Sequence, residues 1–124
     1  MKKQFEQWLS HAIREYNKPG VIAYNFNLYE EWTEEEEENG KFSVQLIGAS
    51  AYDHDNDDWA CKEVFSSKED LFVFVADDWE KCLEIVKELI EEYLIHGEER
   101  HFLLEAKAVS YGFVDGDLEV IRNS

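Results

Sequence analysis

The sequence predicts an α+β fold: a single antiparallel sheet of about four to six strands, with an N-terminal helix and a long helix near residues 78–96 packed on one face. Three observations support this. Apolar residues recur at helical spacing in both helical segments. Runs of alternating apolar and polar residues lie between and after them. The 124 residues, 44% of them apolar, suit one packed core, so we expect a single domain over residues 1–124.

The first helix is expected over residues 3–17. Its apolar positions recur every three or four residues, at Phe5, Trp8, Leu9, Ala12, Ile13 and Tyr16. Lys18-Pro19-Gly20 then ends the pattern, because proline and glycine do not continue a helix. The apolar stripe of this helix is therefore expected to face the core.

Four strands are expected between the two helices. Residues 21–30 and 41–50 alternate apolar and polar side chains, and the Asn39-Gly40 pair before the second segment is typical of a turn. These two segments are predicted to form an antiparallel hairpin. The short segments "CKEVF" (61–65) and "DLFVFV" (70–75) are predicted to continue the sheet as a meander.

The long helix has the clearest pattern in the chain. Its stripe consists of Trp79, Cys82, Leu83, Val86, Ile90, Tyr93 and Leu94. Gly97 supplies the stop signal. After it, residues 108–114 and 118–121 flank the Asp115-Gly116 turn signal and predict a C-terminal hairpin.

The charge restricts the partners. With 12 basic and 29 acidic residues, the chain has a net charge of −17, which argues against binding to nucleic acid or anionic membranes. No apolar run approaches the roughly 20 residues of a membrane span, and the N-terminus does not resemble a secretory signal. We therefore expect a soluble, cytoplasmic protein with no membrane or nucleic-acid partner. Cys61 and Cys82 are expected to be reduced and buried.

The acidic residues concentrate in two runs. Glu34 to Glu38 occupy the loop of the first hairpin, and "DHDNDD" (53–58) follows its second strand. Eight-residue strands would hold these runs on the order of 25 Å apart. If the meander continues, the fourth strand returns to the "DHDNDD" end. This arrangement would bring Asp77 and Asp78 to the same face as that run.

The "DHDNDD" run invites comparison with a calcium loop. Asp53, Asp55 and Asp57 match the first three ligand positions of an EF-hand. The sixth position, which requires glycine, is Asp58, and the twelfth, which requires glutamate, is Val64. The simpler interpretation is a solvated loop whose Asp and Asn side chains form local turn hydrogen bonds. No metal or other cofactor is expected.

A hydrolase would need one protonated and one ionised carboxyl group in different environments. The run 53–58 offers the carboxyl groups but no obvious apolar pocket, and the chain lacks a nucleophile elbow, a Walker loop, HExxH and CxxC. We therefore expect no enzyme and name no catalytic residue. A metal-binding protein or an orphan hydrolase that uses the Asp53–Asp58 cluster remains the alternative.

The charge itself favours a protein-binding role. Carboxylates that take the place of phosphates accelerate encounter with basic enzymes, nucleases above all. Trp59 could serve as an exposed aromatic anchor among the charges, or it could equally belong to the core. The predicted partner contacts are Asp53, Asp55, Asp57, Asp58, Trp59, Asp77, Asp78, Glu34, Glu35, Glu36, Glu37 and Glu38.

Four segments carry a family resemblance: "YNFNLYE", "VQLIGA", "DWACKEVF" and "YGFVDGDLEVI". Together they resemble small acidic bacterial proteins that look like immunity proteins of polymorphic-toxin systems. The resemblance implies an inhibitor that binds and neutralises a basic partner, such as a nuclease-type toxin, in the cytoplasm of the producing cell. None of the four segments is a catalytic motif, and toxin-binding surfaces vary widely in such families, so the resemblance assigns no binding residue.

Overall fold

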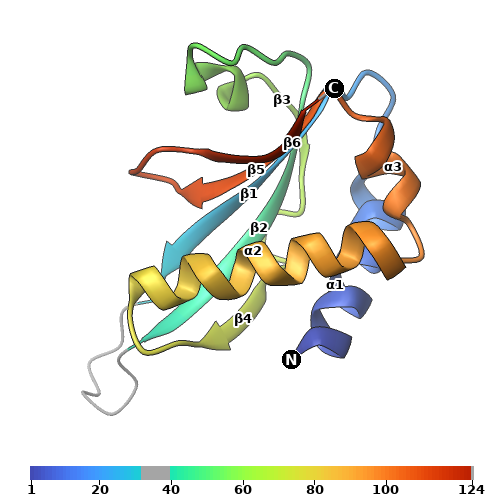
Figure 1. Ribbon diagram of the computed structural model, residues 1–124. Coiled ribbons are helices and arrows are strands. Elements are labelled where there is room, and N and C mark those ends of the chain that lie inside the picture. Colours follow the sequence, from blue (N-terminus) through green and yellow to red (C-terminus); the bar gives the residue numbers. More distant parts are fainter. Residues whose placement is uncertain (32–39, 124) are drawn as a thin grey trace.

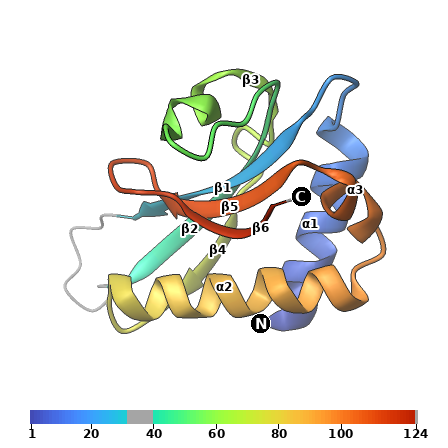
Figure 2. The same cartoon turned by 45° about the horizontal axis from the view of Figure 1, so that its top comes forward.

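The computed structural model describes residues 1–31 and 40–123. A single sheet carries α1, α2 and α3 on one face, with a short 3-10 helix, η2, over the other (Figures 1 and 2). The elements are α1 (Lys2–Tyr16), β1 (Ala23–Glu30), β2 (Lys41–Ala49), η2 (Asp57–Cys61), β3 (Glu63–Ser66), β4 (Phe72–Val75), α2 (Trp79–His96), α3 (Arg100–Glu105), β5 (Ala108–Phe113) and β6 (Glu119–Asn123). The predicted α+β fold with one sheet is confirmed. Within the described ranges, no helix has both the length and the apolar character that crossing a membrane requires.

The sheet has the strand order β3-β2-β1-β5-β6, and β4 also pairs with β2. β1 and β2 form the predicted antiparallel hairpin, with Phe26 opposite Leu46. β5 and β6 form the second antiparallel hairpin. β1 and β5, however, run parallel, with Phe26 opposite Tyr111. The sheet is therefore mixed, which corrects the expectation of a wholly antiparallel sheet for this one pair. The crossover that parallel strands need is supplied by α2 and α3 (Figure 2).

β3 and β4 lie one after the other along the same edge of β2. β3 pairs with β2 at residues 47–49 and β4 at residues 41–44, both antiparallel to it. Between them, Ser67 continues the hydrogen-bond ladder along β2, because its N–H donates to the Leu46 carbonyl (2.9 Å) and its hydroxyl accepts from the Leu46 N–H (3.0 Å). β3 and β4 therefore run in the same direction, and the prediction of a meander, in which the chain reverses between them, is wrong. As a consequence, α2 begins at the end of the sheet opposite to the loop that follows β2.

The main core lies between the helices and one face of the sheet. Phe26 of β1 contacts Phe5 of α1. The Phe5 ring also packs edge-on against Phe72 of β4, with 5.3 Å between the ring centroids. One buried polar link joins the helices, since the Tyr93 hydroxyl lies 2.7 Å from the Ser10 hydroxyl and accepts from the Glu99 N–H (3.1 Å). Most of the apolar stripe of each helix therefore faces the core, as the periodicity predicts, but Trp79 at the start of the α2 stripe is exposed, which corrects the prediction at that residue.

A second, smaller core covers the other face. Ala23, Ala49 and Ala108 lie side by side on three adjacent strands, and their small side chains leave room for the indole of Trp59 from η2. Trp59 is only 3% exposed, and the Tyr52 ring packs edge-on against it, with 5.4 Å between the ring centroids. The expectation of an exposed aromatic anchor at Trp59 is therefore wrong, because this side chain fixes the loop onto the sheet.

The two cysteines differ in exposure, which corrects the expectation that both are buried. Cys82 is buried in the main core, where burial raises the pKa of its thiol to about 12. Cys61 is exposed.

Because the thiolate is the reactive form, Ellman's reagent should modify one thiol, that of Cys61, in the native protein and a second, that of Cys82, only after unfolding in urea. A Cys61→Ser variant should show no rapid native reaction; two rapidly reacting thiols in the native wild type would contradict this packing.

Candidate functional site

The loop from Asp53 to Asp58 is organised by hydrogen bonds from its backbone N–H groups to its own side chains. The Asp53 carboxylate accepts from the Asp55 N–H (2.9 Å), and the Asn56 side chain accepts from the Asp58 N–H (2.9 Å) and so caps η2. The four aspartates are exposed to water. These are the local turn bonds that the simpler interpretation of the run predicts.

The loop does not adopt the arrangement of an EF-hand. Among the described residues, Asp53, His54 and Asp55 offer ligand atoms within 4.8 Å of one another, and all three are exposed. Asp57 points elsewhere, because its carboxylate accepts from the Leu118 N–H at 3.1 Å. The three alternate aspartates therefore do not converge on one cation. Exposure to water also gives the loop no apolar environment that would separate a protonated carboxyl group from an ionised one.

The contact between Asp57 and Leu118 brings the loop to the β5–β6 hairpin. A cleft of about 350 Å³ lies at this junction. We call it the polar cleft, and its lining residues are Asn25, Asn27, Asp57, Asp58, Ala60, Cys61, Phe113, Val114, Gly116 and Leu118. Two of the predicted partner contacts, Asp57 and Asp58, therefore face the C-terminal hairpin.

Asp77 and Asp78 do not join the "DHDNDD" run, and their predicted clustering with it is wrong. Val75, the last residue of β4, pairs with Lys41 at the start of β2, so the next residues lie at the opposite end of the sheet. There, Asp78 caps α2 by accepting from the Lys81 N–H (2.8 Å). Glu34 to Glu38, also predicted as partner contacts, lie outside the described residues.

A groove of about 420 Å³ lies between the first turns of α2 and the β5–β6 hairpin. We call it the acidic groove, and it is lined by Glu30, Trp79, Leu83, Phe113, Asp115, Gly116, Asp117 and Glu119. Phe113 and Gly116 also line the polar cleft, so the two depressions share one hairpin.

The parallel pairing of β1 and β5 forms the sheet side of the acidic groove. Leu28 of β1 lies opposite Phe113 of β5, and its carbonyl accepts from the Val114 N–H (3.3 Å). Glu30, two residues after Leu28, therefore lies beside the turn of the hairpin. On the facing wall, Trp79 and Leu83 are one helical turn apart on α2. Trp79 is 57% exposed, which is unusual for a side chain of this size.

The carboxylates of the acidic groove are not neutralised. Within the described part of the chain, none of Glu30, Asp115, Asp117 and Glu119 forms an ion pair. Some basic side chains elsewhere do have acidic partners: Arg14 binds Glu98 and Glu99, and the Lys2 ammonium lies 2.6 Å from Glu92. The acidic groove therefore combines exposed apolar surface with uncompensated negative charge.

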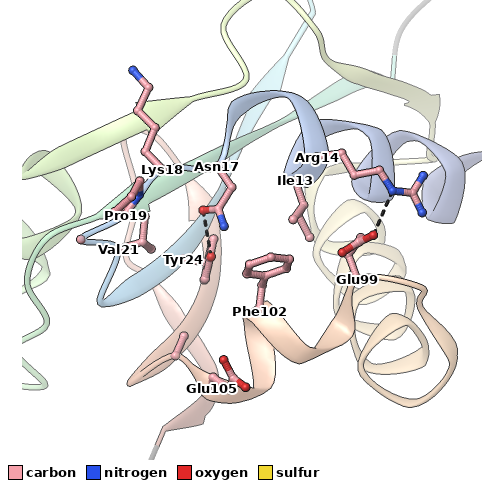
Figure 3. A pocket seen from close by; sticks show the side chains of 12 residues that line it. Ile13, Arg14, Asn17, Lys18, Pro19, Val21, Tyr24, Glu99, Phe102 and Glu105 are labelled. Carbon is pink, nitrogen blue, oxygen red and sulfur yellow. Dashed lines mark hydrogen bonds and ion pairs between the residues drawn. The ribbon is translucent and has the colours of Figure 1, made fainter.

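A larger cavity, of about 660 Å³, lies where α1 ends beside α3 (Figure 3). Ile13 and Phe102 point into it, and the Tyr24 hydroxyl donates to the Asn17 side chain (3.1 Å). Burial raises the pKa of Tyr24 to about 12, so its hydroxyl keeps its proton at neutral pH. Arg14 at the rim is already paired with acidic side chains. Lys18 and Glu105 also line the cavity and form no ion pair among the described residues, so the cavity holds one unpaired charge of each sign and not a cluster of like charges.

The sequence predicts Asp57 and Asp58, which line the polar cleft, as partner contacts, but its local patterns do not predict the acidic groove. The helical periodicity predicts Trp79 in the core stripe of the long helix, and the Asp115-Gly116 pair predicts only a turn. The signal that could have found the groove is the segment from Phe113 to Glu119, where three acidic residues flank a turn. Searches of protein-family models, curated proteins and solved structures find no match to this chain.

Proposed function

We propose that this chain is a protein-binding module, an immunity-type inhibitor that neutralises a basic toxin or enzyme by charge complementarity. One observation carries the proposal: Trp79 stands exposed in a groove whose four carboxylates have no basic partner in the described structure. An aromatic anchor surrounded by charge is typical of interface hot spots. Trp79 takes the role that the sequence assigned to Trp59.

The charge of the whole chain supports the same role. A net charge of −17 attracts a basic protein over long range and raises the rate of encounter. The polar cleft, which shares Phe113 with the acidic groove, extends the surface to Asp57 and Asp58. The partner that fits this surface is a basic protein, such as a nuclease-type toxin, and neither nucleic acid nor a membrane. Such an inhibitor acts in the cytoplasm of the cell that it protects.

The test is capture of a basic protein from the native host at stepped salt concentrations. Wild-type protein should retain such a partner at low salt and release it as the salt rises, because surface charges are screened. A variant in which Glu30, Asp115, Asp117 and Glu119 are replaced by their amides should lose most of this retention.

The matched control removes the same number of charges outside the acidic groove. Its substitutions are Glu15→Gln, Glu63→Gln, Glu69→Gln and Glu105→Gln, all at exposed positions. This control should retain the partner nearly as well as the wild type. Equal losses in the two variants would mean that net charge alone, and not the acidic groove, governs binding. If neither variant loses the partner, the proposal is wrong.

A further inference from the structure

We infer that the acidic groove receives one arginine side chain of the basic partner, with its guanidinium stacked on the indole of Trp79. The inference rests on the proposed function and adds the chemistry of a single contact to it. At about 420 Å³, the acidic groove is in the size range of pockets that hold small ligands. It therefore suits one long side chain better than a whole structural element.

One wall of the groove is apolar. Trp79 and Leu83 lie on the same side of α2, and Phe113 of β5 completes this surface. The aliphatic stem of an arginine can cover such a surface while its charged head reaches polar groups. The exposed indole of Trp79 is the best of the aromatic faces for a cation, and a planar guanidinium can stack on it.

The other wall supplies the acceptors. Glu30 comes from β1, and Asp115, Asp117 and Glu119 come from the β5–β6 hairpin. A guanidinium has five N–H donors in a fixed plane, and unpaired carboxylates can accept two of them at once. Because these four groups have no basic partner in the described structure, they need not break an existing ion pair to bind the cation.

Other cations fit the groove less well. A calcium or magnesium ion prefers a shell of oxygen ligands, whereas Trp79, Leu83 and Phe113 make part of this lining apolar. A lysine ammonium would meet the carboxylates, but it lacks the flat face that stacks on an indole. The combination of an exposed tryptophan with acidic groups therefore favours arginine over both.

The test uses three capped tripeptides, Gly-Arg-Gly, Gly-Lys-Gly and Gly-citrulline-Gly, titrated into the full chain at low salt. The indole N–H resonance of Trp79, assigned with a Trp79→Leu variant, reports binding by NMR. The arginine peptide should shift this resonance saturably and bind at least about three-fold more tightly than the lysine peptide. The uncharged citrulline peptide should cause no saturable shift. Equal binding of all three peptides, or shifts confined to residues outside the groove, would overturn the inference.

Variants separate this inference from the proposed function. Trp79→Leu keeps an apolar side chain but removes both the aromatic face and the indole N–H, so binding to this variant is read from the backbone amide resonances of Asp115 to Glu119 in the groove. In this variant the preference for arginine over lysine should disappear. Val75→Ala, at another exposed apolar position, should keep that preference. If Trp79→Leu keeps the preference, the arginine contact is wrong. The proposed function has its own test, the variant whose four groove carboxylates are replaced by amides. It stands if that variant loses the protein partner and fails if that variant keeps it.

Discussion

A Trp59→Ala variant is expected to lose about 3–5 kcal/mol of unfolding free energy, the usual cost of truncating a buried aromatic side chain. Trp59 is 3% exposed and packs over the three alanines of the second core. A Trp79→Ala variant is expected to lose less than about 1 kcal/mol, because its side chain is 57% exposed. Urea unfolding followed by circular dichroism measures both values.

The comparison separates a structural tryptophan from a binding one. Trp59 and Trp79 are the same residue type, so side-chain chemistry is matched and only the environment differs. The Trp79→Ala protein should remain folded and lose partner retention. If Trp79→Ala were the more destabilised of the two, the indole of Trp79 would belong to the core, and the acidic groove would lose its anchor.

Gly40→Ala is expected to cost more than about 2 kcal/mol, whereas Gly20→Ala should cost only about 1 kcal/mol from backbone strain. Both glycines have positive φ, +89° for Gly40 and +95° for Gly20. A Cβ at Gly40 would lie 2.1 Å from the Ala76 carbonyl oxygen, while one at Gly20 would meet nothing within 4 Å. The difference between the two variants, measured by urea unfolding, therefore isolates the clash with the segment that leads into α2.

This clash bears on the acidic groove, because the Gly40 carbonyl accepts from the Ala76 N–H (2.8 Å) just before α2 begins. The contact ties the start of β2 to the segment that positions Trp79. Equal losses of stability in the two glycine variants would show that residue 76 can move away at no cost. In that case, the placement of Trp79 would not depend on this contact.

Local patterns in the sequence predict much of the fold. The 3.6-residue periodicity identifies both helices, since their apolar stripes pack on the core, and α1 ends at Tyr16, just before Lys18-Pro19-Gly20. The β1–β2 hairpin follows from two alternating segments and a turn signal. Asp57 and Asp58 were correctly expected to be exposed. In each case, the determining interactions lie within or between neighbouring segments.

The remaining features depend on contacts between distant segments. The pairing of β1 with β5 brings residue 23 opposite residue 108, and no local pattern encodes it. The collinear arrangement of β3 and β4 depends on Ser67 continuing the ladder, although its segment reads as an ordinary turn. Trp59 is buried because alanines from three strands meet beneath it, and this too is invisible in sequence. The acidic groove depends on the pairing of β1 with β5, so no local pattern in the sequence predicts it.

The most direct test of the binding surface is site-specific photo-crosslinking in the native host. A benzoylphenylalanine residue replaces Trp79 in the acidic groove in one variant and Glu69, at an exposed turn outside the groove, in another. If the acidic groove binds the partner, the probe at position 79 should crosslink one basic protein and the probe at position 69 should not. Crosslinking of the same protein at both positions with equal yield, or only at position 69, would contradict the claim that the acidic groove is the partner-binding surface.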